Sequence, residues 1–338
     1  MHDLPFVRRP ELALELVGGL ADQVGDLLRV EVDQAPAVVL TLVRLLDPWG
    51  DLWVKLEAFT PFGIVAYGAA LVVVLVRFAV VRTWGAGLAS AAVAAGVALH
   101  LGWFAPMIWG SNPPPREGAE PLRVMVTNLY AGQTDGLDVV RAASEEDVDV
   151  LVATEVTPET LARMERAGLD TLFGHRAGRP APGVKGTMVF ANVRLGTPSR
   201  LGTTWGSWRV PMGEHTLFAV HPHDPTDIAK WRRDHYLIRA AAADEQPDLI
   251  AGDFNATPDH PPMRALADTG YRSAAELANE GWQPTWPAAG ASVLGISLPN
   301  AVDIDHVLVG PAFAAIGTHT LEIPESDHRA LVAELAVK

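Results

Sequence analysis

Two long stretches of apolar residues dominate the first third of the chain. The first covers residues 61–81 and contains one charge, Arg77, near its end; the second covers residues 85–109 and contains none. Each is long enough to cross a hydrocarbon core, which takes about 20 helical residues. Tryptophans stand where interfacial aromatic belts would fall, at Trp84, Trp103 and Trp109. The pattern predicts a transmembrane helical hairpin at residues 61–110, and the alternative is a pair of buried helices in a large soluble core.

Residues 82–84 alone separate the two stretches, so both outer flanks of the hairpin would face the same side of a membrane. Arg77 and Arg82 lie at the tight turn, and positive charge favours the cytoplasmic side. We therefore expect the region after the hairpin to lie outside the cytoplasm. Arg44 and Arg123, near the opposite ends, count against this orientation.

The segments around the hairpin have patterns of their own. In the N-terminal region, residues 1–60, leucines and valines at 11–30 line one face of a predicted helix. The apolar run at 35–46 is too short for a clear membrane span. The proline-rich segment 111–120 predicts a stiff linker, and a globular domain follows at 121–338.

Within the globular domain, strand-like apolar runs alternate with helical patterns. Strands are expected at 122–127, 148–154, 186–193, 216–221, 248–252, 303–309 and 330–337. Helices are expected at 136–147, at 157–168 with Thr157 as N-cap and Pro158 at N1, and at 227–244 with Thr226 as N-cap. The mixed order predicts a layered α/β domain and not a simple doubly wound sheet.

Composition narrows the function classes. The chain has no cysteine, which excludes a disulfide framework, a thiolate nucleophile and cysteine-ligated zinc. The formal net charge is −14, and residues 117–338 carry −12 of it, with 18 basic and 30 acidic side chains. An acidic domain repels a polyanion, so the charge counts against a dedicated nucleic-acid binder.

Polar side chains recur where the predicted strands end. They are Asn128, Glu155, His221, Asp253 with Asn255, Asp305 with His306, and Ser326-Asp327-His328. One such residue is ordinarily a turn former or a helix cap, but a set this rich in Asp, Glu, Asn and His also suits phosphate chemistry. Asp253 and Asn255 stand two residues apart, as residues on one face of a strand do. Hard oxygen ligands with few imidazoles favour Mg²⁺ or Mn²⁺ over zinc.

On these residues the chain resembles the endonuclease/exonuclease/phosphatase superfamily, which has the DNase I-like fold. The matching motifs, in the family's order, are Asn128, Glu155, Val220-His221-Pro222, Gly252-Asp253-Phe254-Asn255, Thr285-Trp286-Pro287, Ile304-Asp305-His306 and Ser326-Asp327-His328. The resemblance covers about residues 121–338. It implies a four-layered α/β sandwich, with two mixed β-sheets flanked by helices, preceded here by the transmembrane hairpin.

The resemblance also implies roles for the matching residues. Glu155, helped by Asn128 and Asp327, would hold Mg²⁺ (or Mn²⁺) against a phosphoryl oxygen. Asp253 would orient and deprotonate the attacking water, with His328 as the alternative general base, while Asn255 holds the phosphoryl group. A metal-dependent hydrolase of phosphoester bonds follows.

The remaining matches concern histidines. Asp305 would orient His328, whose positive charge stabilises the transition state, and His221 would contact the phosphate. The chain departs from the family at Thr154, where members commonly have Gln, and at 190–193, where many have a Ser-Arg pair. Neither departure removes a core catalytic group.

Together these patterns predict an integral protein of the cell membrane with an extracytoplasmic, Mg²⁺-dependent phosphoesterase domain. The layout resembles the VanJ-like membrane-bound bacterial branch, which implies a lipid-linked phosphorylated substrate such as undecaprenyl pyrophosphate. A DNA or RNA nuclease is the first alternative, disfavoured by the acidic charge. A catalytically inactive, membrane-tethered binding module is the second, disfavoured because every expected catalytic position is filled.

Overall fold

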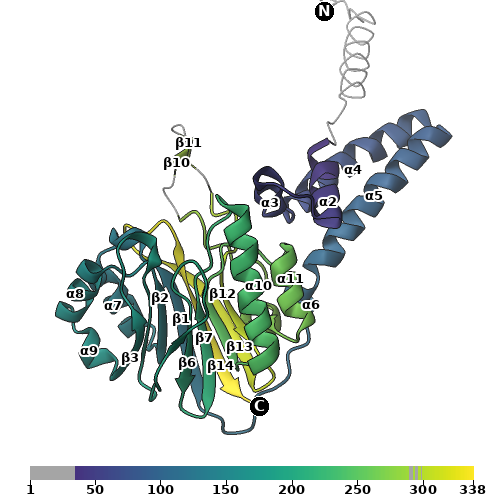
Figure 1. Ribbon diagram of the computed structural model, residues 1–338. Helices are drawn as coiled ribbons and strands as arrows, with labels where there is room; N and C mark the ends of the chain where they lie inside the picture. Colours follow the sequence, from purple (N-terminus) through teal and green to yellow (C-terminus); the bar gives the residue numbers. More distant parts are fainter. Residues whose placement is uncertain (1–34, 289–291, 294–295, 298) are drawn as a thin grey trace, which may run out of the picture. The chain divides into compact units, whose positions relative to one another are not determined.

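The computed structural model describes residues 35–288, 292–293, 296–297 and 299–338. The helix expected at 11–30 lies outside the described residues. The chain divides into two compact units: Met1–Thr41 with Phe62–Leu101, and Leu42–Pro61 with Gly102–Lys338. Figure 1 traces the path of the chain through both.

The described part of the first unit is helical. Its elements are α4 (Phe62–Val81), most of α5 (Trp84–Phe104) and the first half of α2 (Ala35–Leu46). They pack through small and aromatic side chains, among them Ala37, Tyr67, Ala70 and Val93. Thr41 Oγ1 lies 2.9 Å from Tyr67 Oη and 3.0 Å from His100 Nε2, so His100 joins helices by hydrogen bonding, as helix-packing polar residues do.

The second apolar stretch forms a shorter continuous helix than the expected 85–109. α5 ends at Phe104, and the four-residue α6 (Pro106–Trp109) follows. Pro106 has no N–H with which to continue the helical ladder, which explains the break.

The second unit is built on two six-stranded sheets. In spatial order the first contains β13 (Phe313–Glu322), β14 (Arg329–Val337), β1 (Pro121–Asn128), β2 (Val150–Thr154), β4 (Thr187–Ala191) and β3 (His175–Arg179). The second contains β5 (Ser199–Arg200), β6 (Trp208–Met212), β7 (His215–Val220), β8 (Leu249–Asp253), β12 (Asp305–Val309) and β9 (Arg272–Ser273). Both are mixed, because β1 pairs with β2 and β7 with β8 in parallel while the other pairings are antiparallel.

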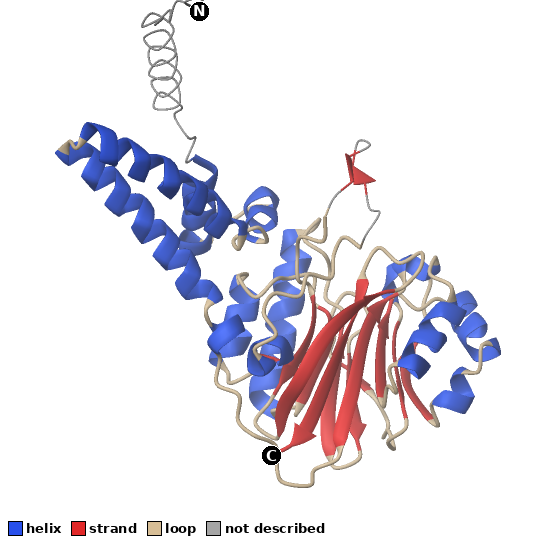
Figure 2. Cartoon of the chain, turned by 180° about the vertical axis from the view of Figure 1, so that it is seen from behind, coloured by secondary structure: helices blue, strands red, loops and turns tan. Residues whose placement is uncertain are grey.

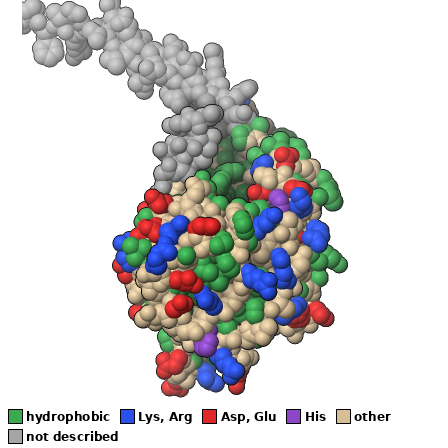
Figure 3. Space-filling model, turned by 60° about the vertical axis from the view of Figure 1, so that its left-hand side comes forward, with side chains coloured by type: hydrophobic (Ala, Val, Ile, Leu, Met, Phe, Trp, Pro, Cys, Tyr) green, Lys and Arg blue, Asp and Glu red, His purple; other side chains and the backbone are tan. Residues whose placement is uncertain are grey.

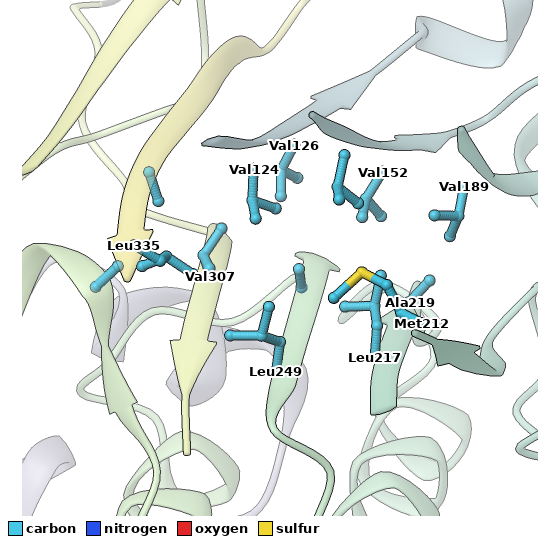
Figure 4. Close-up of a cluster of buried hydrophobic side chains, with 14 of the residues drawn as sticks. Val124, Val126, Val152, Val189, Met212, Leu217, Ala219, Leu249, Val307 and Leu335 are labelled. Atoms are coloured by element: carbon cyan, nitrogen blue, oxygen red, sulfur yellow. The ribbon is translucent and has the colours of Figure 1, made fainter. Parts of the chain in front are cut away.

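The core lies between these sheets. Alternate residues of a strand point to opposite faces, and Val124 and Val126 of β1 point inward while Met125 points outward. Leu217 and Leu249 reach the same core from the second sheet, as Figure 4 shows. The alternation therefore fixes one inner and one outer face for each sheet.

Helices cover the outer faces, as Figure 2 shows. The first sheet packs against α7 (Gly136–Glu145), α8 (Pro158–Arg166) and α9 (Leu169–Leu172). The second packs against α10 (Ile228–Glu245) and α11 (Pro261–Asp268), and Val54 of α3 (Asp51–Glu57) joins this cluster. The remaining short elements are α12 (Ala274–Ala278), β10 (Ser292–Val293), β11 (Ile296–Ser297) and the 3₁₀ turns η1 (Tyr130–Gly132) and η2 (Gly183–Lys185). These layers confirm the expected DNase I-like sandwich.

One cap prediction is wrong. Asp227, not Thr226, caps α10, because its side chain accepts a 3.2 Å hydrogen bond from the Lys230 N–H. The Thr226 hydroxyl instead donates a hydrogen bond to the Asp224 carboxylate. Competition between neighbouring side chains for the same turn thus moves the helix start by one residue.

Candidate active site

The ends of several strands bring the predicted residues to one edge of the sandwich. Asn128 ends β1 and Glu155 follows β2, and these parallel strands are paired so that Asn128 lies opposite Thr154. In the second sheet, Asp253 at the end of β8 lies opposite Asp305 at the start of β12. Carboxylates and amides from both sheets therefore meet at a common edge.

Two hydrogen bonds connect the sheets at this edge. Asn128 Nδ2 of the first sheet donates to Asp253 Oδ2 of the second at 2.9 Å. His328, directly before β14 of the first sheet, has its Nδ1 2.8 Å from Asp305 Oδ2 of the second. All four side chains are at most 5% exposed. The site therefore lies where the edges of the two sheets meet, which we call the seam. It needs side chains from both sheets.

Gly252 permits the close packing of β7 and β8 beside the seam. Its φ is +147°, and a Cβ at this position would lie 2.0 Å from the carbonyl oxygen of Val220. An L-residue would have to push β7 away. The glycine of the Gly252-Asp253-Phe254-Asn255 motif therefore serves to place Asp253.

Glu155 is held by backbone and side-chain donors. Its carboxylate accepts from Asn128 Nδ2 at 3.2 Å and from the Ala131 N–H. Its φ is +59°, an uncommon left-handed conformation for glutamate that costs on the order of 1–2 kcal/mol. Burial raises the pKa of the Glu155 carboxyl. A strained, partly dehydrated carboxylate at a strand end is typical of a functional position.

Asn128 faces the two carboxylates with its amide nitrogen. Its Oδ1 accepts a 2.9 Å hydrogen bond from the Tyr130 N–H. In this orientation Asn128 holds Glu155 and Asp253 together as a hydrogen-bond donor to both carboxylates.

The Asp305–His328 pair joins a carboxylate to an imidazole whose pKa is raised. Burial alone would lower the pKa of His328, but the Asp305 carboxylate, its hydrogen bond and the nearby Asp253 raise that pKa to about 10. Burial, together with Asp305, raises the pKa of Asp253. His328 Nε2, the free end of the ring, lies 3.9 Å from Asp253 Oδ2.

Asn255 and His221 are the other site residues that the second sheet contributes. The Asn255 N–H donates to Asp253 Oδ1 at 2.8 Å, and its Nδ2 donates to the Pro222 carbonyl at 3.2 Å. His221 Nε2 is 3.7 Å from Asp253 Oδ2, too far for a hydrogen bond. Burial lowers the pKa of His221 to about 3, so its ring is neutral.

Three side chains of the site lie close enough together to be considered as ligands of a cation. One oxygen or nitrogen atom each of Asp253, Asp305 and His328 lie within 4.8 Å of one another. A positively charged His328 would repel a cation there. Glu155 and Asp327 offer oxygens only, and Asp327 Oδ1 is buried without a hydrogen-bond partner among the described residues.

Three residues that support the site had no role assigned to them from the sequence. Ser326 Oγ donates to the Asn128 carbonyl at 2.8 Å and accepts from the His328 N–H at 3.1 Å. Thr285 Oγ1 accepts from the Asp305 N–H at 3.2 Å. Trp205 stacks on His223, with ring centroids 4.7 Å apart, and tilts against His221 at 4.6 Å. Ser326 and Thr285 stood inside recognised motifs, whereas no pattern marked Trp205.

Charge is mixed on one face of the molecule. On the face that Figure 3 shows, lysine and arginine side chains alternate with aspartate and glutamate. Combined with the acidic balance of residues 117–338, this arrangement differs from the continuous basic surface that nucleic-acid binders commonly present.

Comparisons with known proteins agree with the geometry. The chain matches the profile of the Endonuclease/Exonuclease/phosphatase family over residues 125–328, a range that contains every site residue described above. Among curated proteins, none matches the chain in sequence.

Solved structures share the fold. An endonuclease/exonuclease/phosphatase family protein from Bacteroides thetaiotaomicron aligns with a TM-score of 0.50 and 14% identity, over 65% of this chain and 99% of that one. A 3′ phosphatase from Neisseria, bound to a product DNA hairpin, aligns at 0.51 and 15%, over 63% and 98%. An AP endonuclease from Archaeoglobus fulgidus aligns at 0.50 and 14%, over 63% and 98%. Likeness at this identity establishes a common fold.

Proposed function

This chain belongs to the endonuclease/exonuclease/phosphatase family, and from that premise we propose that it is a membrane-anchored, Mg²⁺-dependent phosphoesterase. Membership makes it a metal-dependent hydrolase of phosphoester bonds. The main support for the proposed reaction is the seam between the sheets. There buried Asp253 from one sheet meets Asn128 from the other, and Asp305 orients His328. Further residues support magnesium as the metal, a membrane anchor and the class of substrate.

The donor set supports a hard divalent cation. Glu155 and Asp327 supply carboxylate oxygens, and the buried Asp327 Oδ1 has no other described partner. Such a set suits Mg²⁺, with Mn²⁺ as the close substitute, and the chain has no cysteine to favour zinc. Glu155, Asp327 and Asn128 would hold the ion, which when bound supplies Lewis-acid stabilisation of a phosphoryl oxygen.

The other side chains carry out the displacement at phosphorus. Asp253 accepts a hydrogen bond from the attacking water and takes its proton as the water oxygen bonds to phosphorus. The bond from phosphorus to the leaving oxygen breaks in the same displacement. Asn255 and His221 orient the phosphoryl group, and His328 directs its Nε2–H at the developing negative charge.

Two helices support the anchor. α4 and α5 have mean hydropathies of 2.5 and 1.5 in their most apolar windows, of which only 11% and 17% of the residues are buried. Such exposure favours lipid contact over the core of a soluble protein. With both outer flanks on one side, the turn at Arg77 and Arg82 would face the cytoplasm and the catalytic domain the outside.

An anchored hydrolase encounters substrates of the membrane surface. The acidic catalytic region and the layout, which resembles the VanJ-like branch, favour a lipid-linked phosphate or pyrophosphate such as undecaprenyl pyrophosphate over nucleic acid. The same seam chemistry applies to either, because only the group attached to phosphorus differs.

The test compares these substrates on the full-length protein in lipid nanodiscs. With Mg²⁺ we expect phosphate release from undecaprenyl pyrophosphate, no nicking of supercoiled plasmid DNA, and loss of release with EDTA. Mn²⁺ should restore part of the rate. Degradation of DNA without phosphate release from the lipid would contradict the proposal. Protease accessibility in spheroplasts tests the orientation, since cleavage of the catalytic domain is expected only from outside.

A further inference from the structure

The segment Leu42–Pro61, which precedes the first apolar helix, belongs to the same compact unit as the catalytic domain. It is tied to that domain by three ion pairs between residues far apart in the sequence. The pairs are Arg44–Asp259 at 2.8 Å, Asp47–Arg232 at 3.2 Å and Glu57–Arg264 at 2.8 Å. Glu57 is only 1% exposed, so its carboxylate is shielded from water, whereas the Arg264 side chain is 29% exposed.

A histidine adds a fourth connection. His260 is 3% exposed, and its Nδ1 accepts a 2.8 Å hydrogen bond from the Thr257 N–H. Its Nε2 lies 2.8 Å from the carbonyl oxygen of Val54. A neutral ring with hydrogen on Nε2 satisfies both partners. His260 therefore joins α3 to the loop that precedes α11.

That loop begins at the catalytic motif. Phe254 and Ala256 are fully buried in the same hydrophobic cluster as Val54. Trp231 of α10 donates its Nε1–H to the Asn255 carbonyl at 2.9 Å, and its ring stands edge-on to His260 with centroids 5.5 Å apart. The backbone that carries Asn255 is thus fixed from one side by α10 and, through residues 257–264, by the segment 42–61.

We propose that the segment Leu42–Pro61 is a positioning element of the active site, which holds the loop 253–260 in its catalytic conformation. The catalytic part of this inference rests on the proposed function of Asn255; the structural part does not. Catalysis depends steeply on such placement, because a displacement of about 1 Å can reduce a rate by about 100-fold. The segment before the membrane helices then acts as part of the enzyme and not as a spacer.

The experiment uses the full-length protein in nanodiscs and the variant Glu57→Ala. Removing the buried carboxylate takes away the ion-pair partner of Arg264 and leaves the space of the Glu57 side chain unfilled, which should loosen the loop. We expect amide hydrogen exchange in peptides covering 254–264 to rise by at least about tenfold, while peptides from β14 stay unchanged. Phosphate release should lose about 10- to 100-fold in kcat with little change in KM, because substrate binding groups other than the loop remain.

Matched variants separate positioning from general damage. Glu57→Gln keeps a hydrogen-bond acceptor for Arg264 and should restore most of kcat and of the exchange protection. Glu165→Ala removes an exposed pair to Arg176, 2.6 Å long and remote from the loop, and should change neither readout. Arg44→Gln removes the pair to Asp259 together with the contact of the guanidinium with the Trp103 ring. It covers the case in which Glu57→Ala does not fold, with an expected rise in loop exchange of about threefold.

Unchanged exchange at 254–264 in Glu57→Ala, or in Arg44→Gln if the former fails to fold, would overturn the proposal. Raised loop exchange with wild-type kcat would overturn its catalytic part. Failure of the wild-type protein to release phosphate would refute the proposed function alone, since the exchange measurement needs no substrate.

Discussion

Asp305→Asn tests how much of the catalysis depends on the orientation of His328. Asp305 is fully buried, and its Oδ2 lies 2.8 Å from His328 Nδ1. Asparagine removes the charge and can present its amide nitrogen to Nδ1, which would favour the opposite tautomer of the ring. A hydrogen bond between charged partners contributes about 1.5–3 kcal/mol. At about 1.4 kcal/mol for each factor of ten, kcat should fall by about 10- to 150-fold.

The assay is the initial rate of phosphate release from undecaprenyl pyrophosphate at saturating substrate and Mg²⁺, with thermal denaturation to establish folding. Asp149→Asn is the matched control, because Asp149 accepts a 2.9 Å hydrogen bond from the Arg123 N–H before the start of β2, at the opposite end of the sheet. It should retain wild-type turnover. A folded Asp305→Asn protein with kcat within about twofold of wild type would refute the reasoning.

Two further predictions concern stability. Gly252→Ala should lower the melting temperature more than Gly213→Ala. Both positions have positive φ, but only a Cβ at Gly252 would contact backbone, 2.0 Å from the Val220 oxygen. Equal shifts in a thermal melt would contradict this prediction. Burial lowers the pKa of His260 to about 4, against about 6.5 in an unfolded chain, so its contribution to stability is complete above pH ~6.5 and is lost as the pH falls toward 4. Between pH 7.5 and 5 the wild type should therefore lose on the order of 2 kcal/mol more than His260→Gln in urea unfolding, and equal losses would show that His260 is not the group responsible.

Local patterns predicted much of the fold because the buried strands are short, apolar and followed by polar residues. β2 and β8 are fully buried, and their apolar runs end directly before Glu155 and at Asp253. The sequence did not predict β13, because its pairing with β14 shifts register between Ala315 and Gly317 and its residues do not alternate regularly. A strand that carries such an irregularity gives no periodic signal.

The motifs predicted which residues form the site, but not how they meet. Asn128 and Asp253 are 125 positions apart, and their hydrogen bond exists only because two sheets end at one edge. The packing of α3 against the catalytic domain could not be predicted from the sequence either. Of its seven residues only Val54 and Glu57 are buried, and a glutamate on the buried side breaks the usual amphipathic pattern.

The central claim is that hydrolysis occurs at the seam between the sheets, and turnover of Asp253→Ala tests it most directly. Asp253 is 1% exposed and bonded to both Asn128 and the Asn255 N–H, so it contacts both sides of the site. Phosphate release by the folded, full-length variant should fall by about 100-fold or more relative to wild type, as expected for loss of a general base. Wild-type release from a folded Asp253→Ala protein would place the chemistry elsewhere.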